Sequence, residues 1–315
     1  MMKADHRSEK MNTIKFLKGV LLLIGIVIIS SSALPAKTID KIEFPPLEDI
    51  EMPEIEKFTL DNGMVVYLHE DHKLPLVEAA IRLAAGEYTS PVDKIGLAEI
   101  TGEVMRTGGT ENHTGDEIDE ILEGIGASIE CNIGKTSGRI RLNILSEYAD
   151  IGLQLMADIV RNPIFDEDKI DLEKTAQRSI ISRRNDNPDD ICIREFMKII
   201  YGSESPIARY PEYATIDNIS RDDLIDYHQR YINPENTMLA VWGDFDTDEM
   251  KAKVEKYFAD WPQGPGKVPA LPEVNYVFEP GVHYIEKGNL NQSSILIGHI
   301  GGLLGDPDYL SLIHI

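Results

Sequence analysis

The sequence predicts an α+β fold in which helices pack on an antiparallel sheet. Strand-like runs come in pairs joined by short turns, at 58–68 and 127–145, and helical patterns fill most of the remaining chain to residue 259. Pairs of strands followed by several helices are typical of α+β domains. The 315 residues, of which 42% are apolar, are enough for one large or two medium globular domains.

The first strands are predicted around an Asn-Gly turn. Residues 58–60 and 64–68 are rich in strand-forming residues and flank Asp61–Asn62–Gly63. Asn-Gly between such runs indicates a β-hairpin, because both residues tolerate the backbone that a tight turn requires. The run 76–85 predicts a third strand, which ends at Gly86.

Helices and two further strands are predicted in the middle of the chain. Over 96–106 the apolar residues recur at helical spacing, and Gly108–Gly109 ends the helix. Thr114 and Glu117 form a capping box that opens a helix through Ile125. Strands are then expected at 127–133 and 138–145.

The part of the chain after residue 146 is predicted to be mostly helical. Prolines follow two of these helices, and the residue before a proline disfavours helical backbone. The expected helices cover 147–161, 166–184, 189–201, 220–231 and 246–259, with one buried strand at 237–243.

Composition excludes one class of function. The 54 acidic and 31 basic residues give a net charge of −23, which repels the phosphates of nucleic acid. The acids are spread along the whole chain, which favours a role in solubility over attraction for basic peptides. The two cysteines, Cys131 and Cys192, do not make a disulfide framework and are expected to be buried small apolar residues.

The first 36 residues are predicted to be a secretory signal peptide. Lys15 and Lys18 precede the apolar run 19–29, and the small residues of 30–36 offer a cleavage site. An uncleaved N-terminal anchor is the alternative. We therefore expect an exported protein of the periplasm or cell envelope, with residues 1–36 outside the fold.

Proline and glycine content predicts the other boundaries. Residues 37–54 are acidic and proline-rich and are expected to be an extended lead-in to a domain over 55–262. Four prolines and two glycines in 261–272 indicate a linker, which we place at 263–272.

A second domain is expected to begin after the linker. Residues 273–309 form its start, with strands predicted at 282–286 and 293–300. The last six residues, 310–315 (LSLIHI), match the translation of a sequencing adapter, so we expect a truncated fragment whose tail is not native.

Five segments, in order over 55–262, resemble the family of insulinase, pitrilysin and mitochondrial processing peptidase. They read FTLDNGMVVYLHED, GLAEITGEVMRTGGT, GIGASIECNIGKTSGRIRL, SRRNDNPDD and DDLIDYHQRYINPENTMLAVWGDFD. The similarity continues in QSSILIGHIGG. The resemblance implies two homologous α+β domains, of which the second is truncated here.

Active members of this family carry H-x-x-E-H on the first helix, where two histidines bind zinc and the glutamate activates a zinc-bound water. By resemblance, Glu99 and Glu103 stand at the histidine positions and Gly102 at that of the base. Ile180 stands at the position of the third ligand, a glutamate of a later helix. The stretch 86–112 holds no histidine, so we expect no catalytic residues, no zinc and no other cofactor.

Two other groups of side chains resemble metal ligands. Glu99, Glu103 and Glu173 offer a site for a hard cation, but calcium takes about six to eight oxygens, so we favour solvated acids on a cleft wall. His69 and His72 follow a strand, where a polar turn is favoured over a metal pair.

One strand is a candidate for peptide binding. Ala127, Ser128, Ile129, Glu130 and Cys131 resemble the family's edge strand, which holds substrate peptide by strand addition; an ordinary sheet strand is the alternative. Strand addition uses backbone groups and does not need the zinc. We therefore predict a non-catalytic peptide-binding subunit in a heterodimer with an active zinc metalloendopeptidase of the family. The alternatives are an active peptidase with a rearranged site and a stand-alone peptide-binding scaffold.

Overall fold

A computed structural model describes residues 53–273, 279–288, 290–299, 301–303, 305–307, 309 and 311. The predicted signal peptide and almost all of the lead-in lie outside the described residues, as does most of the predicted tail. No helix of the described part is long and apolar enough to cross a membrane.

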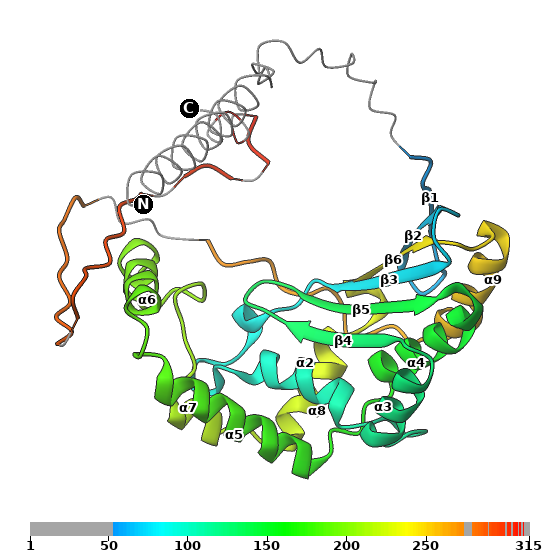
Figure 1. Cartoon of the computed structure of the whole chain (residues 1–315), viewed down its shortest axis with the longest axis horizontal. Coiled ribbons are helices and arrows are strands. Elements are labelled where there is room, and N and C mark those ends of the chain that lie inside the picture. The colour runs from blue at the N-terminus through cyan, green and yellow to red at the C-terminus, as the bar shows by residue number, and fades with distance from the viewer. Residues whose placement is uncertain are drawn as a thin grey trace, which may run out of the picture. The chain divides into compact units, whose positions relative to one another are not determined.

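A six-stranded sheet in the order β1-β2-β6-β3-β5-β4 forms the centre of the fold (Figure 1). The strands are β1 (Glu56–Thr59), β2 (Val65–Glu70), β3 (Leu76–Leu83), β4 (Ser128–Ile133), β5 (Gly138–Leu145) and β6 (Thr237–Gly243). Neighbouring strands are antiparallel except β2 and β6, which are parallel. The sheet is therefore mixed and not wholly antiparallel as predicted, because β6 inserts between β2 and β3, a pairing that local patterns do not encode.

Most of the helices cover one face of this sheet, whereas α6 (Pro188–Tyr201) lies away from it (Figure 1). Their bounds are α2 (Leu97–Thr107), α3 (Gly115–Gly124), α4 (Ala149–Arg161), α5 (Glu167–Arg183), α6 (Pro188–Tyr201), α7 (Tyr213–Asp217), α8 (Arg221–Tyr231) and α9 (Thr247–Phe258). The predicted helices are confirmed with small shifts at their ends, whereas the short α7 was not predicted. The capping box is confirmed, because the Thr114 side chain accepts from the backbone N–H of Glu117 and the Glu117 carboxylate accepts from that of Thr114.

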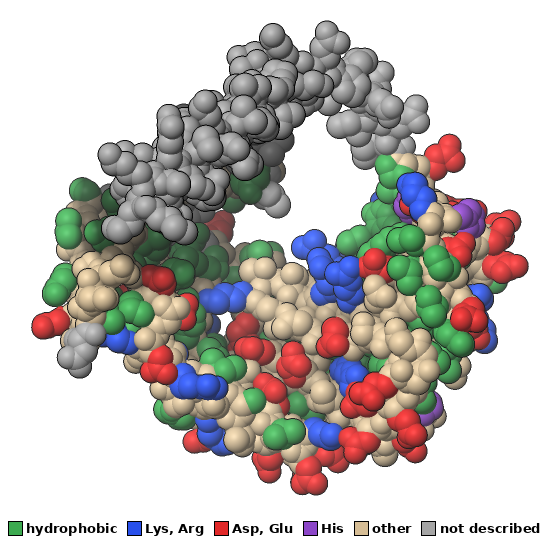
Figure 2. All heavy atoms as spheres, viewed as in Figure 1, with side chains coloured by type: hydrophobic (Ala, Val, Ile, Leu, Met, Phe, Trp, Pro, Cys, Tyr) green, Lys and Arg blue, Asp and Glu red, His purple; other side chains and the backbone are tan. Residues whose placement is uncertain are grey.

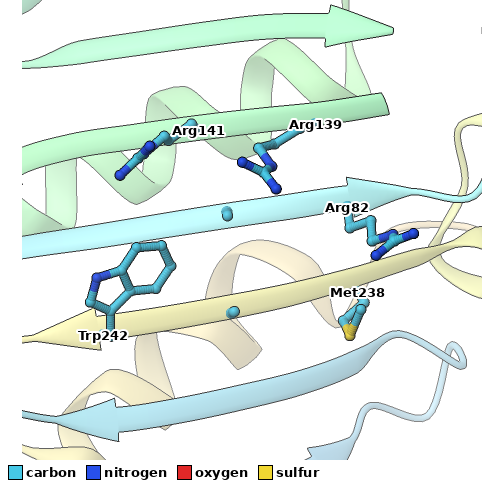
Figure 3. A pocket seen from close by; sticks show the side chains of 7 residues that line it. Arg82, Arg139, Arg141, Met238 and Trp242 are labelled. Carbon is cyan, nitrogen blue, oxygen red and sulfur yellow. The ribbon is translucent and has the colours of Figure 1, made fainter. Parts of the chain in front are cut away.

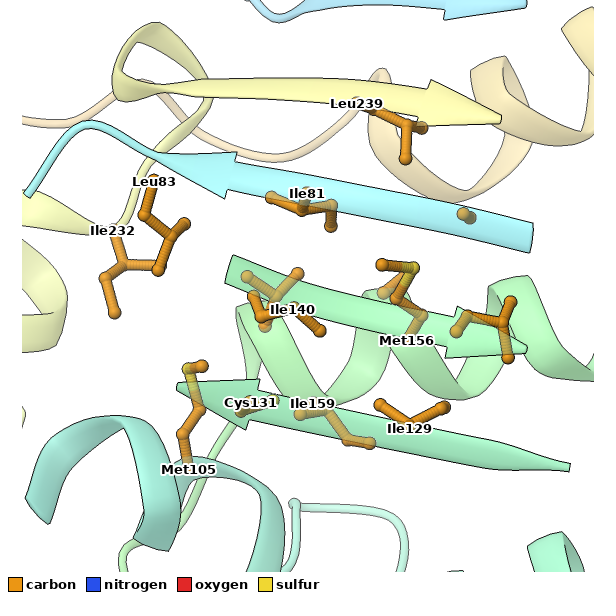
Figure 4. Packing of buried hydrophobic residues seen from close by; sticks show 14 of the residues in the cluster. Ile81, Leu83, Met105, Ile129, Cys131, Ile140, Met156, Ile159, Ile232 and Leu239 are labelled. Carbon is orange, nitrogen blue, oxygen red and sulfur yellow. The ribbon is translucent and has the colours of Figure 1, made fainter. Parts of the chain in front are cut away.

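The hydrophobic core lies between the sheet and these helices. Alternate residues of each central strand point into it, so that Ile81 of β3, Ile140 of β5 and Leu239 of β6 are fully buried. Figure 4 shows Met105 of α2 directed toward β4, where Cys131 is also buried. The prediction that both cysteines are buried is confirmed for Cys131 and wrong for Cys192, which is only partly buried.

The strands predicted at 282–286 and 293–300 are wrong for the residues that the structure describes. Residues 282–286 and 293–299 form neither helix nor strand. A strand requires a neighbour to take its backbone hydrogen bonds, and strand propensity is realised only in that context. The described residues after the linker contain no such neighbour. Ser294 instead donates to Asp189 at the start of α6.

Asn62 joins the two ends of the described domain. Its side-chain amide donates to the carbonyl oxygens of Phe258 at 2.7 Å and Trp261 at 3.2 Å, and its oxygen accepts from the N–H of Met64 at 3.2 Å. The residue is 7% exposed. The first hairpin is thereby fastened to the end of α9.

We expect Asn62→Ala to lower the free energy of unfolding by about 2–3 kcal/mol, because two buried carbonyls and one N–H lose their partner. The adjacent Asp61→Ala, at an exposed position, is the control and should change it by less than about 0.5 kcal/mol. Urea unfolding followed by circular dichroism measures both. Equal stabilities of the two variants would contradict this role for Asn62.

Candidate functional site

Helix α2 carries three of the four positions that the resemblance assigns to the zinc-peptidase motif. Its buried stripe packs on β4 and on neighbouring helices, and this leaves Glu99 and Glu103 partly exposed while Gly102 is buried. Ile180 lies on α5, which also contacts α2, and is 56% exposed. The fold thus brings both elements of the motif together, without the side chains that the motif requires.

Gly102 is the point of closest approach between α2 and β4. A Cβ atom at this position would lie 2.9 Å from the backbone nitrogen of Ile133 and 3.0 Å from its Cγ1. Real Cβ atoms essentially never come so close to another backbone atom. The position that the resemblance assigns to the catalytic base is therefore closed by the edge strand, and a side chain there would require α2 or β4 to shift.

The carboxyl groups around this contact repel one another. Burial raises the pKa of Glu103, and the charges of Glu173, Glu99 and Glu130 raise it further. Burial also raises the pKa of Glu173, with a contribution from Glu99. Within the described ranges, none of these four forms an ion pair with a lysine or arginine.

The residues at the motif positions do not fit zinc. Two carboxylates without an imidazole are a poor donor set, and Ile180 offers no ligand atom at all. Among the residues that the structure describes, no group of three or more His, Cys, Asp or Glu is arranged to hold a metal ion. No step of hydrolysis by the family mechanism follows from this arrangement.

Strand β4 lies at the edge of the sheet and pairs only with β5. The N–H of Gly134 donates to the carbonyl of Ser137 at 3.0 Å, which fixes the hydrogen-bonded positions of the hairpin. Because hydrogen-bonded and non-hydrogen-bonded pairs alternate in an antiparallel ladder, Ile129, Cys131 and Ile133 direct their N–H and C=O groups away from β5. Of the predicted segment 127–131, only Ile129 and Cys131 therefore offer backbone groups at the edge.

Arg106, one turn after Gly102 on α2, occupies part of this edge. Its Nε donates to the carbonyl oxygen of Ile129 at 3.1 Å, and its terminal nitrogen pairs with Asp119 of α3 at 2.5 Å. Sequence reasoning missed Arg106, because nothing local indicates that a helix residue reaches the strand.

Glu87 holds the start of α2. Its two carboxylate oxygens accept from the N–H groups of Gly96 at 2.8 Å and Ala98 at 3.1 Å. Its own N–H donates to the carbonyl of Gly134, at the end of the β4 hairpin. Burial raises the pKa of Glu87 to about 7, and the charge of Glu99 contributes.

His69 and His72 do not form a pair. His72 lies between two carboxylates, 2.7 Å from Glu70 and 2.6 Å from Asp244, while His69 contacts the carbonyl of Glu54. The hydrogen bond with Asp244, followed by that with Glu70, raises the pKa of His72. His72 thus belongs to a polar junction at the ends of β2 and β6.

The face of the sheet that the helices leave open carries a second group of polar residues. Arg82 and Arg139 lie directly opposite each other on β3 and β5. With Met238 they line one end of a shallow hollow of about 360 Å³, and Trp242 lies at its other end (Figure 3). Basic side chains gather in a few places on a surface that is otherwise largely acidic (Figure 2). Side chains alternate between the two faces of a sheet along each strand, so the spacing of these arginines in β3 and β5 could have predicted that they lie on one face of the sheet.

Two sequence models of protein families match the chain. Residues 65–207 match the one described as insulinase (peptidase family M16), and residues 218–313 match the one described as the peptidase M16 inactive domain.

Curated relatives agree with these matches. An uncharacterized zinc protease of Rickettsia bellii is 27% identical over 77% of this chain. The beta subunit of the mitochondrial-processing peptidase of Saccharomyces cerevisiae is 23% identical over 82% of it. The chain spans only 58% and 56% of the lengths of these two relatives.

Solved structures share the fold. A peptidase M16 inactive domain from Pseudomonas fluorescens superposes with a TM-score of 0.66 at 22% identity, over 70% of this chain and 54% of that one. The periplasmic protease PqqL of Escherichia coli gives 0.63 at 15% identity, over 71% of this chain and 26% of that one.

We expect Gly102→Ala to lower the free energy of unfolding by about 1–3 kcal/mol, because the new methyl group meets the backbone of β4. Gly124→Ala is the matched control, since a Cβ at this exposed end of α3 meets nothing within 4 Å; it should be neutral or stabilise by up to about 1 kcal/mol. Chemical unfolding of both variants measures the difference. A neutral Gly102→Ala would show that α2 and β4 are not in close contact.

The pKa of Glu87 makes stability depend on pH. The carboxyl titrates near 4.5 in the unfolded chain and near 7 in the fold, so its contribution is complete below pH 4.5 and is lost as the pH rises through 7. We expect Glu87→Gln to remove up to about 3 kcal/mol of the fall in stability between about pH 5 and pH 8.

Unfolding by urea across this pH range measures the slope. Glu103 and Glu173 contribute in the same direction, so part of the slope should remain in Glu87→Gln. The exposed Glu123→Gln is the control and should keep the slope of the natural protein. An unchanged slope in Glu87→Gln would contradict the raised pKa.

Proposed function

The chain belongs to the insulinase family of peptidases, family M16, and from this premise we propose that it is a non-catalytic, peptide-binding subunit. In this role it partners an active zinc metalloendopeptidase of the same family, outside the cytoplasm. Its contribution is a surface that holds extended peptide beside the partner's catalytic centre.

The approach of Gly102 to Ile133 carries the non-catalytic part of the proposal. Loss of ligands by substitution alone would leave the shape of a zinc site intact. Here the space for the base is filled by β4, with 2.9 Å between the position of a Cβ and the Ile133 nitrogen. Restoring the glutamate by mutation would therefore not restore its geometry.

The unpaired edge of β4 supports the peptide-binding part. Outward backbone groups of an edge strand are a template for another strand, and proteins generally blunt or cover such edges. In β4 the carbonyl of Ile129 is taken by Arg106, whereas no described residue donates to or accepts from the outward groups of Cys131. An added strand needs only such groups and no catalytic metal.

Partnership and export are supported by resemblance and by the first residues of the chain. One relative is named as a subunit, which indicates that this family includes multi-chain peptidases. One solved neighbour is named a periplasmic protease. Residues 1–36 have the charge and apolar pattern of a signal peptide, which supports export from the cytoplasm.

The test measures zinc content and peptide cleavage for the full-length protein, alone and mixed with a family homologue that carries H-x-x-E-H and is encoded beside it. We expect no stoichiometric zinc and no cleavage by the protein alone, and faster cleavage in the mixture than by the homologue alone. Loss of cleavage when the homologue's motif glutamate is replaced by glutamine would assign the chemistry to the partner.

Two other results would each lead to a different function. Stoichiometric zinc and cleavage by the protein alone would overturn the non-catalytic assignment. Peptide binding by the protein alone, with no effect on any homologue, would favour a stand-alone scaffold over a subunit.

A further inference from the structure

We propose that the open face of the sheet binds a small carboxylic acid with an apolar body, whose carboxylate is held by Arg82 and Arg139. The site is the hollow of about 360 Å³ that these arginines line at one end and Trp242 at the other (Figure 3). It is separate from the proposed function, because it uses neither the motif positions on α2 nor the edge of β4.

The pairing of β3 with β5 brings the two arginine side chains together. The N–H of Ser146 donates to the carbonyl of Pro75 at 3.1 Å, which makes the odd-numbered residues of β3 the hydrogen-bonded positions toward β5. Arg82 and Arg139 are therefore an opposed pair without backbone hydrogen bonds between them. In such pairs the side chains approach most closely.

No described acid neutralises this pair of arginines. Across the sheet, Arg139 has Asn132 on its other side and Arg82 has Met238, and neither of these residues is charged. Like charges directly opposite each other on a sheet are unfavourable. In a chain with a net charge of −23, this uncompensated positive pair is a place where a bound anion gains free energy.

The third arginine of this face is different, because it already has a partner. Arg141 forms an ion pair with Glu78 of β3, and Glu130 lies opposite it on β4. The positive charge that is free to hold a ligand is therefore concentrated at the end of the hollow where Arg82 and Arg139 lie.

The rest of the hollow is apolar. Ala80 and Ala240 lie directly opposite each other on β3 and β6, and their small side chains form its floor between the larger residues at its two ends (Figure 3). From Met238 to Trp242 the strand advances by about 13 Å. A carboxylate fills only part of this length, so a ligand that fills the hollow has an apolar body that covers the alanines and reaches the indole ring.

The two guanidinium groups match a carboxylate in number and shape. A carboxylate has two oxygens that accept hydrogen bonds, and a guanidinium is a planar group with several N–H donors. Each arginine can thus donate to one oxygen. A phosphate has a third oxygen, for which this end of the hollow offers no further basic side chain among the described residues, since the Asn132 side chain hydrogen-bonds Glu103.

The experiment is isothermal titration calorimetry of the full-length protein with octanoate. We expect one saturable site. Octanamide, which keeps the body without the charge, and butyrate, which keeps the charge with a shorter body, should each bind about tenfold more weakly. Octyl phosphate should bind no more tightly than octanoate.

Variants of the arginines locate the carboxylate. Arg82→Gln and Arg139→Gln should each weaken octanoate binding about tenfold, because each removes a charged donor. Neither should lower the stability of the free protein to urea, since each also removes a like-charge contact. Arg141→Gln removes the same charge from an arginine that is already paired, and should weaken binding by less than about threefold.

Tryptophan fluorescence locates the apolar body. The chain has two tryptophans, and Trp261 is buried at 5% exposure, so a change on ligand binding reports on Trp242. Octanoate should shift the emission to shorter wavelength, whereas acetate at the same concentration should not.

Several results would overturn the site. Equal affinity for octanoate and octanamide would exclude an anion site, and unchanged affinity in both Arg82→Gln and Arg139→Gln would exclude this location. Binding of octanoate without any change in tryptophan emission would contradict the placement of the body, and tighter binding of octyl phosphate would overturn the choice of head group. No binding at all would refute the inference and leave the proposed function unaffected.

Discussion

The packing of α2 against β4 at Gly102 is the constraint on which the rest of the site depends. It sets the distance between α2 and the edge strand β4. A glutamate at position 102 and this contact exclude each other, because the side chain and the backbone of β4 would occupy the same space. Glu87 and Arg106 fasten the two ends of the same helix.

The carboxyl groups around α2 and those at the polar junction by His72 have pKa values that are shifted in opposite directions. Around α2 the carboxyl groups of Glu87, Glu103 and Glu173 hold their protons more tightly than usual, which means that burial and like charges oppose their ionisation. At the polar junction by His72 the opposite holds, and hydrogen bonds lower the pKa of Glu70 and Asp244. Burial of like charges is common at functional sites, whereas hydrogen-bond networks in which every group has a partner stabilise a fold.

Local signals predicted most elements but few of the contacts that make the site. Residues 138–145 form a strand with the predicted bounds, and the box of Thr114 and Glu117 caps α3, because these features depend on near neighbours. The positions that the resemblance assigns to the motif, Glu99, Gly102 and Glu103, lie on α2. Other contacts join residues that are far apart in sequence, so no periodicity or capping rule predicts them. These are the contact of the Glu87 carboxylate with the start of α2, the hydrogen bond from Arg106 to Ile129, and the pairing of β2 with β6.

The place of β6 in the sheet determines when the domain can fold. Leu239 lies between Val66 of β2 and Ile81 of β3, so the two halves of the sheet share no hydrogen bonds until the chain has been made as far as β6. Closing the long loop between β2 and β6 costs conformational entropy and is slow. Until β6 is in place, β2 and β3 each present an unpaired edge. The two halves of the sheet therefore join only after residues Thr237–Gly243 have been synthesised.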